Sequence, residues 1–520
     1  MSQDVLRTPE TPPEEKLTGF LGLVERVGNK IPSPHALFAI LFVVIAVVAS
    51  VVAWVGARVR VPGAEEELTV KAPLSADGLV TLLTGAVDNF ITFPALPTVL
   101  VIALGIGIAQ GSGALEAAIR LLFSRVPRAV APYAVALIAT SGHVMADTAY
   151  VVIPPLAALA FLAVGRHPLA GLIGAYACVG TGYAGGLLLG GLDANLAGIT
   201  QEAASALPGW EDYAANLSMN YYFGIVAALG LTVVGGLMID TFLEPRLGEW
   251  RPEDRAEESG SAGGALAVAG QTRAVLVAVG VTLAYAALVV TLWLLPGSAL
   301  RGEDGALIPS PFMSGLIVLI ALGFAIFGIT YSFALPKGEG RRDIGAMMEE
   351  SIRSVASFTV LIFLIAQALA MLSYSNLGIW VAVELAGAAE SIGLEGLPLL
   401  LGLALISTVM NLLITSGSGL WALEAPVVVP TLMMLDLSPA TIQAAHRIGD
   451  SLTQAVSPMN VFLFVVLLEA RKWVPGFTLG QLLRHVVPFV PVFAVIWVSV
   501  LCGFVLLELP PGPGETTYLP

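Results

Sequence analysis

The amino-acid sequence predicts an all-α integral membrane protein, first of all from its composition. Of the 520 residues, 57% are apolar and only 12% are charged, and the mean hydropathy is +0.86. Soluble domains carry about 25% charged residues, and one buried core cannot absorb so much apolar surface. The composition therefore excludes the soluble, collagen-like, disordered and disulfide-scaffold classes and indicates a single polytopic helical domain.

Long apolar segments are the second observation behind this fold class. A spanning helix needs about 20 mostly apolar residues, and the clear candidates are 36–56, 97–111, 219–240, 273–295, 313–335 and 486–507. Residues 1–34 are polar and proline-rich. Because 36–56 is long enough to span, we interpret it as a first helix rather than a cleavable signal. We expect a tail over 1–34, a transmembrane domain over 35–507 and a second tail over 508–520.

The third observation is that the middle stretches, 130–191 and 355–435, are apolar but interrupted. The breaks are expected at Ser141-Gly142, Pro154-Pro155, Gly180-Thr181-Gly182, Ser416-Gly417-Ser418-Gly419 and Pro426. Broken segments at corresponding places in two halves indicate the binding site of a transporter, because only a protein-lined cavity can satisfy the exposed backbone. We expect a transport core over approximately 130–200 and 400–470, with the other helices forming a frame and a dimer contact.

The distribution of Lys and Arg predicts how the chain is oriented. Basic residues gather in 7–30, 120–128, 246–255, 337–353 and 471–484, whereas 508–520 has none. We expect the N-terminus in the cytoplasm and the C-terminus outside. Ends on opposite faces require an odd number of crossings, and about nine fits. With 24 basic residues against 38 acidic ones the net charge is −14, and no nucleic-acid partner is expected.

A weak internal repeat supports a core with two related halves. Residues 136–140 (Ala-Leu-Ile-Ala-Thr) resemble 404–408 (Ala-Leu-Ile-Ser-Thr), and each string precedes a Ser-Gly break. Each half then has a β-branched run ending in proline, 151–154 and 427–430, and later an intramembrane aspartate, Asp193 or Asp450. The shared order of these features is more persuasive than the short strings alone. It favours an inverted-repeat transporter core.

Ionisable groups at membrane depth are costly, so they are functional candidates. The strongest group lies in 439–460, where Arg447 and Asp450 share a helical face and Gln454 lies one turn further on. Pro458 is expected to break this helix and to free carbonyl oxygens. Asp450 then suits either a sodium ion or a proton relay, and a structural ion pair with Arg447 is the alternative. Pro439 and Asn460 belong to the same group.

A second group surrounds the expected break at 415–419. Asn411 precedes the break, and Trp421, Glu424 and Pro426 follow it. Small hydroxyl residues such as Ser418 at a re-entrant tip can coordinate a cation or a carboxylate. Trp421 offers a flat face for an aromatic substrate, or else lies at the membrane interface. Glu424 is either a proton acceptor or a charge that lines a cavity.

Two further groups of residues are weaker candidates for a functional site. His143 and Asp147 lie four residues apart, so a Ser141-His143-Asp147 hydrolase site would need loop geometry rather than a helix. The glycines of 180–191 lead to Asp193, but no Gly-Lys-Ser/Thr follows them, and close helix packing explains many of them. No His-Glu-x-x-His motif is present. We expect no cofactor, and we interpret Cys178 and Cys502 as buried small hydrophobic residues.

Four strings resemble the AbgT family: 24–32, 191–200, 411–421 and the string Ala-His-Arg-Ile-Gly-Asp-Ser of 445–451. The resemblance extends over nearly the whole chain. It departs from the family pattern at 183–186, at Gln454 and at Glu424, where we expect an apolar residue.

The resemblance implies a bacterial inner-membrane secondary transporter that takes up p-aminobenzoyl-glutamate or exports sulfonamide antimetabolites. It also implies a bowl-shaped homodimer, with nine helices and two re-entrant hairpins in each protomer. By motif position, it assigns the substrate and ion site to Asp193, Asn411, Ser418, Trp421, Pro439, Arg447, Asp450 and Pro458.

These lines together predict an ion-coupled carrier with an elevator or rocking core. Asp450 and Asp193 would exchange a proton or bind a cation such as sodium, with Asp450 as the candidate sodium ligand. Arg447 would pair with a substrate carboxylate or with Asp450, and Trp421 would stack on an aromatic ring. An ion channel and an intramembrane hydrolase are the alternatives from other classes. The direction of flux and the coupling ion stay open at this point.

Overall fold

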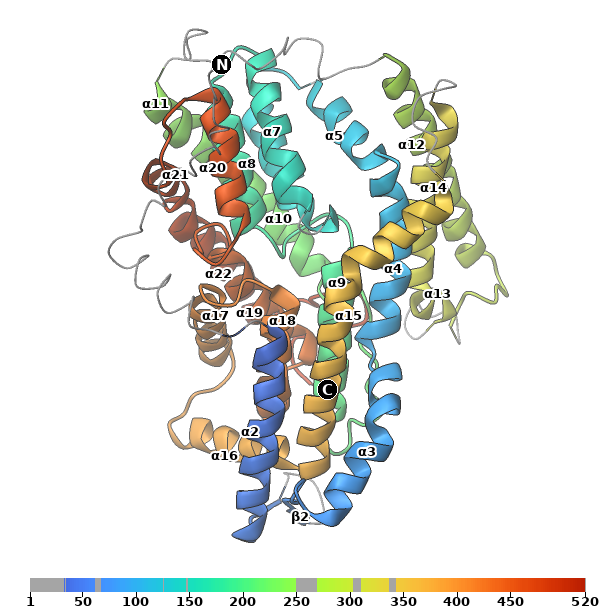
Figure 1. Cartoon of the computed structure of the whole chain (residues 1–520), viewed down its shortest axis with the longest axis vertical. Helices are drawn as coiled ribbons and strands as arrows, with labels where there is room; N and C mark the ends of the chain where they lie inside the picture. The colour runs from blue at the N-terminus through green and yellow to red at the C-terminus, as the bar shows by residue number, and fades with distance from the viewer. Residues whose placement is uncertain are drawn as a thin grey trace, which may run out of the picture.

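The structure, a computed structural model, describes residues 32, 34–60, 67–124, 126–145, 148–248, 269–302, 310–335 and 343–519. The described chain is helical almost throughout, as Figure 1 shows. Most of the expected tail over 1–34 and the side chain of Asp147 lie outside these residues. So do several basic residues used for the orientation, including Arg7, Lys337 and Arg341.

The N-terminal part supplies many of the helices of the predicted frame. Its elements are α2 (Pro34–Trp54), β1 (Arg58–Arg60), β2 (Glu67–Thr69), α3 (Ala76–Ile91), α4 (Ala95–Gly111) and α5 (Ala114–Ser124). The two short strands pair antiparallel, with Val59 opposite Leu68. The long helix α15 (Ile344–Ser375) packs against α2, α3 and α4 and leads into α16 (Leu377–Ser391).

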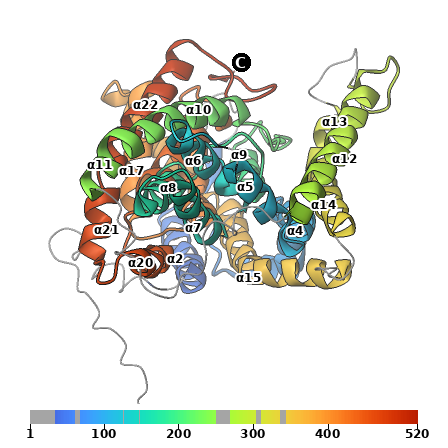
Figure 2. The ribbon, with the colours of Figure 1, turned by 90° about the horizontal axis from the view of Figure 1, so that it is seen from above.

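An outer arm is attached to this frame. It consists of α12 (Ala269–Leu294), α13 (Pro311–Ser314) and α14 (Leu316–Ala334). Helices α12 and α14 pack on each other, and α14 packs on α4. Seen from above in Figure 2, the arm stands apart from the main body of helices. Apolar side chains of α12 such as Leu283 and Leu288 are exposed on it, which suits a face in contact with lipid.

The remaining elements form the body that contains the predicted core. Its first half comprises α6 (Ala131–Thr140), η1 (Gly142–Met145), α7 (Thr148–Ala163), α8 (Pro168–Thr181), α9 (Gly191–Ser205), α10 (Tyr221–Leu237), η2 (Met238–Leu243) and α11 (Glu244–Leu247). Its second half comprises α17 (Leu397–Asn411), α18 (Gly417–Met433), α19 (Pro439–Leu452), α20 (Phe462–Trp473), α21 (Leu479–Val486) and α22 (Phe489–Leu506).

Helix length and composition confirm an all-α membrane protein. Within the described ranges, five helices are long and apolar enough to cross a membrane: His35–Trp54, Tyr221–Leu247, Gly270–Leu294, Leu316–Ala334 and Leu479–Leu506. Two bent helix pairs raise this number to seven if each counts as one span. The expected span 97–111 belongs to one of these pairs, because α4 and α5 meet at 59°. The total of about nine crossings stays a prediction.

The predicted breaks are confirmed at some positions and wrong at others. Helix α6 ends at Thr140 before the Ser141-Gly142 break, α8 ends at Thr181, and α18 begins at Gly417 after its break. In contrast, Pro154 and Pro155 lie inside α7, and Pro426 and Pro430 lie inside α18. Neighbouring helices can satisfy the backbone groups that a proline frees in a membrane helix, so these prolines do not end their helices.

Two helices at the centre of the body are buried along their whole length. Every residue of α8 and every residue of α19 is buried. Helix α8 is apolar and rich in Ala and Gly, which allows close approach of its neighbours. Helix α19 has a strongly polar sequence, Pro-Ala-Thr-Ile-Gln-Ala-Ala-His-Arg-Ile-Gly-Asp-Ser-Leu. A polar helix in such a position must find its partners inside the protein.

The C-terminal segment returns to the start of α19. Leu437 and Tyr518 form an antiparallel bridge, and the Leu519 amide donates to the Asp436 carbonyl at 2.8 Å. Nearby, Asn216 Nδ2 donates to Glu515 Oε1 at 2.7 Å. Burial raises the pKa of the Glu515 carboxyl from its usual 4.5 to about 7. The Glu515 carboxyl group, which favours its protonated form, therefore helps to hold the C-terminal segment in place.

Docking of 509–519 should weaken as the pH rises. Because the folded pKa of Glu515 lies above the unfolded one, its contribution to stability is complete below pH 4.5 and is lost as the pH rises to about 7. We expect amide hydrogen-exchange protection in this segment to fall roughly tenfold or more between pH 5 and pH 8. Glu515→Gln should remove this dependence, whereas Glu508→Gln, at an exposed position, should keep it. Equal pH dependence in all three proteins would contradict the assignment.

Candidate functional site

The polar residues of α19 form the centre of the candidate site. Pro439 occupies the first turn, where its missing amide hydrogen costs nothing, and Ser438 caps the helix by accepting from the Thr441 amide at 3.2 Å. Helices α17, α18, α9, α8 and α22 pack around α19. Side chains of α19 therefore meet residues from both halves of the body, and two polar clusters result.

The first cluster joins α19 to α9 through an ion pair. Arg447 Nη2 lies 2.7 Å from Asp193 Oδ1, and both side chains are almost fully buried. Asp193 Oδ2 accepts from the Gly190 amide at 2.8 Å and lies 3.5 Å from His143 Nε2. Arg447 Nη1 also donates to the Ala184 carbonyl at 3.2 Å. Both oxygens of Asp193 therefore have partners.

The ion-pair partner of Arg447 corrects one expectation. The sequence allowed Arg447 to pair with Asp450, three residues further along the helix, but in this structure its guanidinium pairs with Asp193. The long Arg side chain reaches across to α9, where the first-turn carboxylate of Asp193 is already fixed by Gly190. Spacing along one helix gives proximity but does not decide between a neighbour on the same helix and one on another.

Asp450 forms the second cluster, and it is less completely bonded. Its Oδ1 accepts from Gln454 Nε2 at 3.2 Å, whereas its buried Oδ2 has no hydrogen-bond partner in the described structure. Gly417, the first residue of α18, lies directly against this carboxylate, and a Cβ atom there would overlap Oδ2. The carboxylate thus lies at the N-terminal end of α18, where the helix dipole favours negative charge.

The predicted residues of the broken segment gather around these clusters. Asn411 Nδ2 donates to the Asp450 carbonyl at 2.6 Å and to Thr453 Oγ1 at 3.2 Å. Trp421 Nε1 donates to Thr200 Oγ1 at 2.8 Å, and its ring lies on that of His446, with centroids 4.5 Å apart. Trp421 is fully buried rather than interfacial. Ser418 is buried in the first turn of α18.

Pro458 does not break α19 as the sequence suggested. The helix ends at Leu452, and Pro458 lies in the turns that follow. The carbonyls freed there have protein partners: the Ala455 carbonyl accepts from Tyr176 at 3.0 Å, and that of Gln454 accepts from Asn460 at 2.9 Å. The end of α19 is therefore held by side chains of its neighbours.

Sequence reasoning did not find three polar residues that connect the cluster of Arg447 to Trp421. Gln443 Nε2 donates to Thr200 Oγ1 at 2.6 Å, and Gln443 Oε1 accepts from Asn220 Nδ2 at 2.7 Å. Helical spacing points to two of them, since Gln443 lies one turn before Arg447 and Thr200 two turns after Asp193. Asn220 precedes α10 and has no such relation to the others.

The Ser-His-Asp arrangement considered for a hydrolase is not assembled. His143 Nε2 bonds to the Leu188 carbonyl at 2.8 Å and faces Asp193 rather than Ser141. Ser141 Oγ is buried without a partner among the described residues, and Asp147 lies outside them. The segment 141–145 instead directs His143 toward the first polar cluster.

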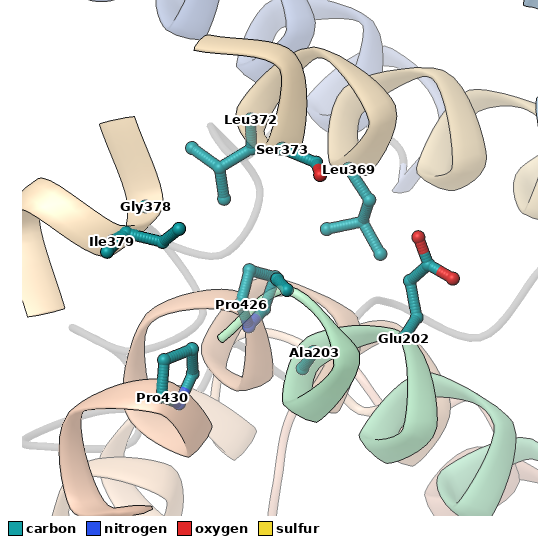
Figure 3. A pocket seen from close by; sticks show the side chains of 10 residues that line it. Glu202, Ala203, Leu369, Leu372, Ser373, Gly378, Ile379, Pro426 and Pro430 are labelled. Atoms are coloured by element: carbon teal, nitrogen blue, oxygen red, sulfur yellow. The ribbon is translucent and has the colours of Figure 1, made fainter. Parts of the chain in front are cut away.

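A pocket lies beside the site, at the boundary between core and frame. Figure 3 shows it between Pro426 and Pro430 of α18, Glu202 of α9 and Leu369 of α15. Glu202 is the charged residue of its mostly apolar lining. The clusters themselves are closed, since Asp450 and Trp421 are 0% exposed.

Helices broken inside the membrane domain, with buried charged residues at the breaks, define the class of protein. This is the arrangement of a membrane transporter, in which binding sites lie at discontinuous helices. Buried ionisable groups within a membrane domain are functional candidates.

Comparison with known proteins agrees with this class. Residues 19–519 match the model of the AbgT transporter family. The chain is 35% identical to the p-aminobenzoyl-glutamate transport protein of Escherichia coli K12 over 510 residues, which is 96% of this chain and 98% of that protein. The chain belongs to the AbgT family.

Two solved structures have the same fold. The YdaH transporter of Alcanivorax borkumensis is 33% identical, with a TM-score of 0.86 over 93% of this chain and 100% of that chain. MtrF of Neisseria gonorrhoeae, described as illuminating a class of antimetabolite efflux pumps, is 34% identical, with a TM-score of 0.88 over 96% of this chain and 100% of that chain. These findings confirm the resemblance seen in the sequence and a transporter rather than an enzyme.

Gly417→Ala should destabilise the protein because the new methyl group would overlap Asp450 Oδ2. Overpacking of this kind costs about 1–3 kcal/mol, which should lower the thermal unfolding midpoint in detergent. Gly402→Ala on α17 is the matched control, because a Cβ atom there meets open space. Equal midpoints for the two variants would contradict the close approach of Asp450 to α18.

Asp193→Asn should destabilise the protein by leaving the Arg447 charge buried without its counter-ion. Removing one partner of a buried ion pair costs about 3–5 kcal/mol. Asp193→Asn combined with Arg447→Gln removes both charges, so it should recover part of that loss. The unfolding midpoints of the single and double variants test this. A double variant less stable than the single one would show that the pair is not coupled in this way.

Proposed function

We propose that the protein is a proton-coupled secondary transporter of p-aminobenzoyl-glutamate or a related aromatic carboxylate, in a bacterial inner membrane. The name of the E. coli relative supports the substrate class. The observation that carries the coupling is the carboxylate of Asp450, which is buried with one oxygen unpartnered in the described structure. Export of sulfonamide-type antimetabolites is the second candidate, and the name given to MtrF favours it.

The two aspartates have different surroundings and therefore different roles. Asp193 has partners at both oxygens, including a guanidinium at 2.7 Å, so it stays ionised. Asp450 has one amide donor and one unpartnered oxygen. An uncompensated buried carboxylate favours binding a proton. Asp450 is therefore the residue that gains and loses a proton during transport.

The ligands around Asp450 favour a proton over sodium. Hard cations collect several oxygen ligands, whereas the Asp450 carboxylate receives an amide N–H from Gln454. The Asn411 amide bonds to the main-chain carbonyl of Asp450. Protonation of Asp450 would remove the negative charge facing the start of α18. The segment that precedes α18 would then act as a hinge that moves when Asp450 is protonated.

Substrate binding requires exchange of contacts that now close the site. Arg447 would release the Ala184 carbonyl and bind a substrate carboxylate, and Trp421 would stack on the aromatic ring when His446 moves away. Movement of the core against α15 and α16 would open the boundary marked by the pocket at Glu202. We also propose that the protein forms a homodimer through its frame helices. Its N-terminus lies in the cytoplasm.

The test uses purified full-length protein in liposomes with radiolabelled p-aminobenzoyl-glutamate and, separately, a labelled sulfonamide. A pH gradient and a sodium gradient are imposed one at a time. We expect concentrative movement under the pH gradient alone. Flux in the direction of the proton gradient indicates symport, and flux against it indicates antiport.

Asp450→Asn should reduce gradient-driven flux roughly tenfold or more while leaving the folded protein intact, because the amide cannot take up the coupling proton. Asp77→Asn at an exposed position of α3 is the matched control and should transport normally. Flux driven only by sodium would overturn the proton assignment. Unimpaired transport by Asp450→Asn would overturn the role of this residue.

A further inference from the structure

A second buried acid lies beside Asp450, and the mechanism above does not use it. Glu424 of α18 points its Oε2 at His446 Nδ1 of α19, at 2.7 Å. Ser407 of α17 donates to the same oxygen at 2.7 Å. Glu424 is 6% exposed, and His446 and Ser407 are 0% exposed. Three helices of the core therefore meet at one carboxylate and one imidazole.

The geometry fixes how many protons the pair can hold. Ser407 and His446 both approach Glu424 Oε2, so at least one proton lies between Nδ1 and that oxygen. With that proton alone the pair carries one negative charge, and with a second proton it is neutral overall. Glu424 Oε1 and His446 Nε2 are both buried without partners in the described structure. Each of these atoms can take the second proton.

Most of the charged groups around the pair are acidic. The charged residues described on the elements packed against the pair are Arg447 and Asp450 on α19, Asp193 and Glu202 on α9, the exposed Glu384 and Glu390 on α16, and Asp343, Glu349, Glu350 and Arg353 toward the start of α15. Arg447 is engaged by Asp193, and Arg353 is highly exposed beside Glu349 and Glu350. Within the described residues, then, Glu424 and Asp450 share no free buried cation. Two such carboxylates resist being ionised together.

The pair is also connected to the substrate side of the site. His446 lies one helical turn before Asp450, on the same face of α19. Its ring lies under that of Trp421, which bonds to Thr200 and so reaches the cluster of Arg447. A protonated imidazole is attracted to an indole face. A second proton on the imidazole therefore changes the contact between the His446 and Trp421 rings.

We propose that Glu424 and His446 form a second proton-binding site, so that each transport cycle moves two protons, one on Asp450 and one on this pair. The proposal rests on the proton coupling proposed above. No bond other than the one to the proton forms or breaks. The second proton enters from one side of the membrane, resides on Glu424 or His446 Nε2, and leaves on the other side.

The test measures the number of protons per substrate at the point of zero net flux. The membrane potential of the proteoliposomes is clamped at zero, and the p-aminobenzoyl-glutamate concentrations on the two sides of the membrane are set at a fixed ratio. The pH difference is then varied until flux stops. A tenfold substrate ratio is balanced by about one pH unit for one proton and about half a unit for two. The wild type should give about half a unit and Glu424→Gln about one unit. Glu384→Gln, an exposed change of the same kind on α16, should match the wild type.

A second variant keeps the test decisive if Glu424→Gln does not fold. Replacing both members of a buried pair with apolar residues is often tolerated, so Glu424→Leu with His446→Leu should remain monodisperse and move one proton per substrate. A wild type that balances at about one unit, or variants that balance at about half a unit, would overturn the proposal. Absence of any flux driven by the pH gradient in the wild type would instead overturn the proposed proton coupling itself.

Discussion

Complete burial of the polar helix α19 is the constraint on which the rest of the structure depends. Gln443, His446 and Arg447 of this helix each meet a polar group of a neighbouring helix, as buried polar side chains require. Asp193, which follows the glycines of 180–191, pairs with Arg447, and Asn411, before the break in front of α18, donates to the main-chain carbonyl of Asp450. Residues next to the breaks therefore help to stabilise α19.

The two clusters on α19 differ in how completely their charges are compensated. Arg447 and Asp193 neutralise each other, and breaking that pair would be expensive. Asp450 faces the start of α18, and Glu424 of α18 bonds to Ser407 of α17. Each of the two carboxylates has an unpartnered oxygen in the described structure. Trp421 lies between the clusters, with its Nε1 on Thr200 and its ring on His446. The Trp421 side chain therefore connects the two clusters.

Glycines, which have no Cβ atom, allow these helices to approach one another closely. The Asp450 carboxylate occupies the space that a side chain at position 417 would fill. Gly449 lies against Ser407 of α17. In a membrane, small residues at helix contacts supply packing that the hydrophobic effect does not. The same residues bring charged groups within hydrogen-bond distance of one another. Packing and chemistry are thus decided by the same positions.

From the sequence alone, the class of fold and the positions of several breaks could be predicted, because charge within apolar segments is visible in composition and spacing. The same signals singled out candidate site residues, whose roles stay predictions. Helical spacing also placed Arg447 and Asp450 on one helical face. It could not decide that Arg447 pairs with Asp193, that Pro426 continues α18, or that Glu424 meets His446. Those contacts join residues far apart in the chain, and only the packing of one helix against another brings them together.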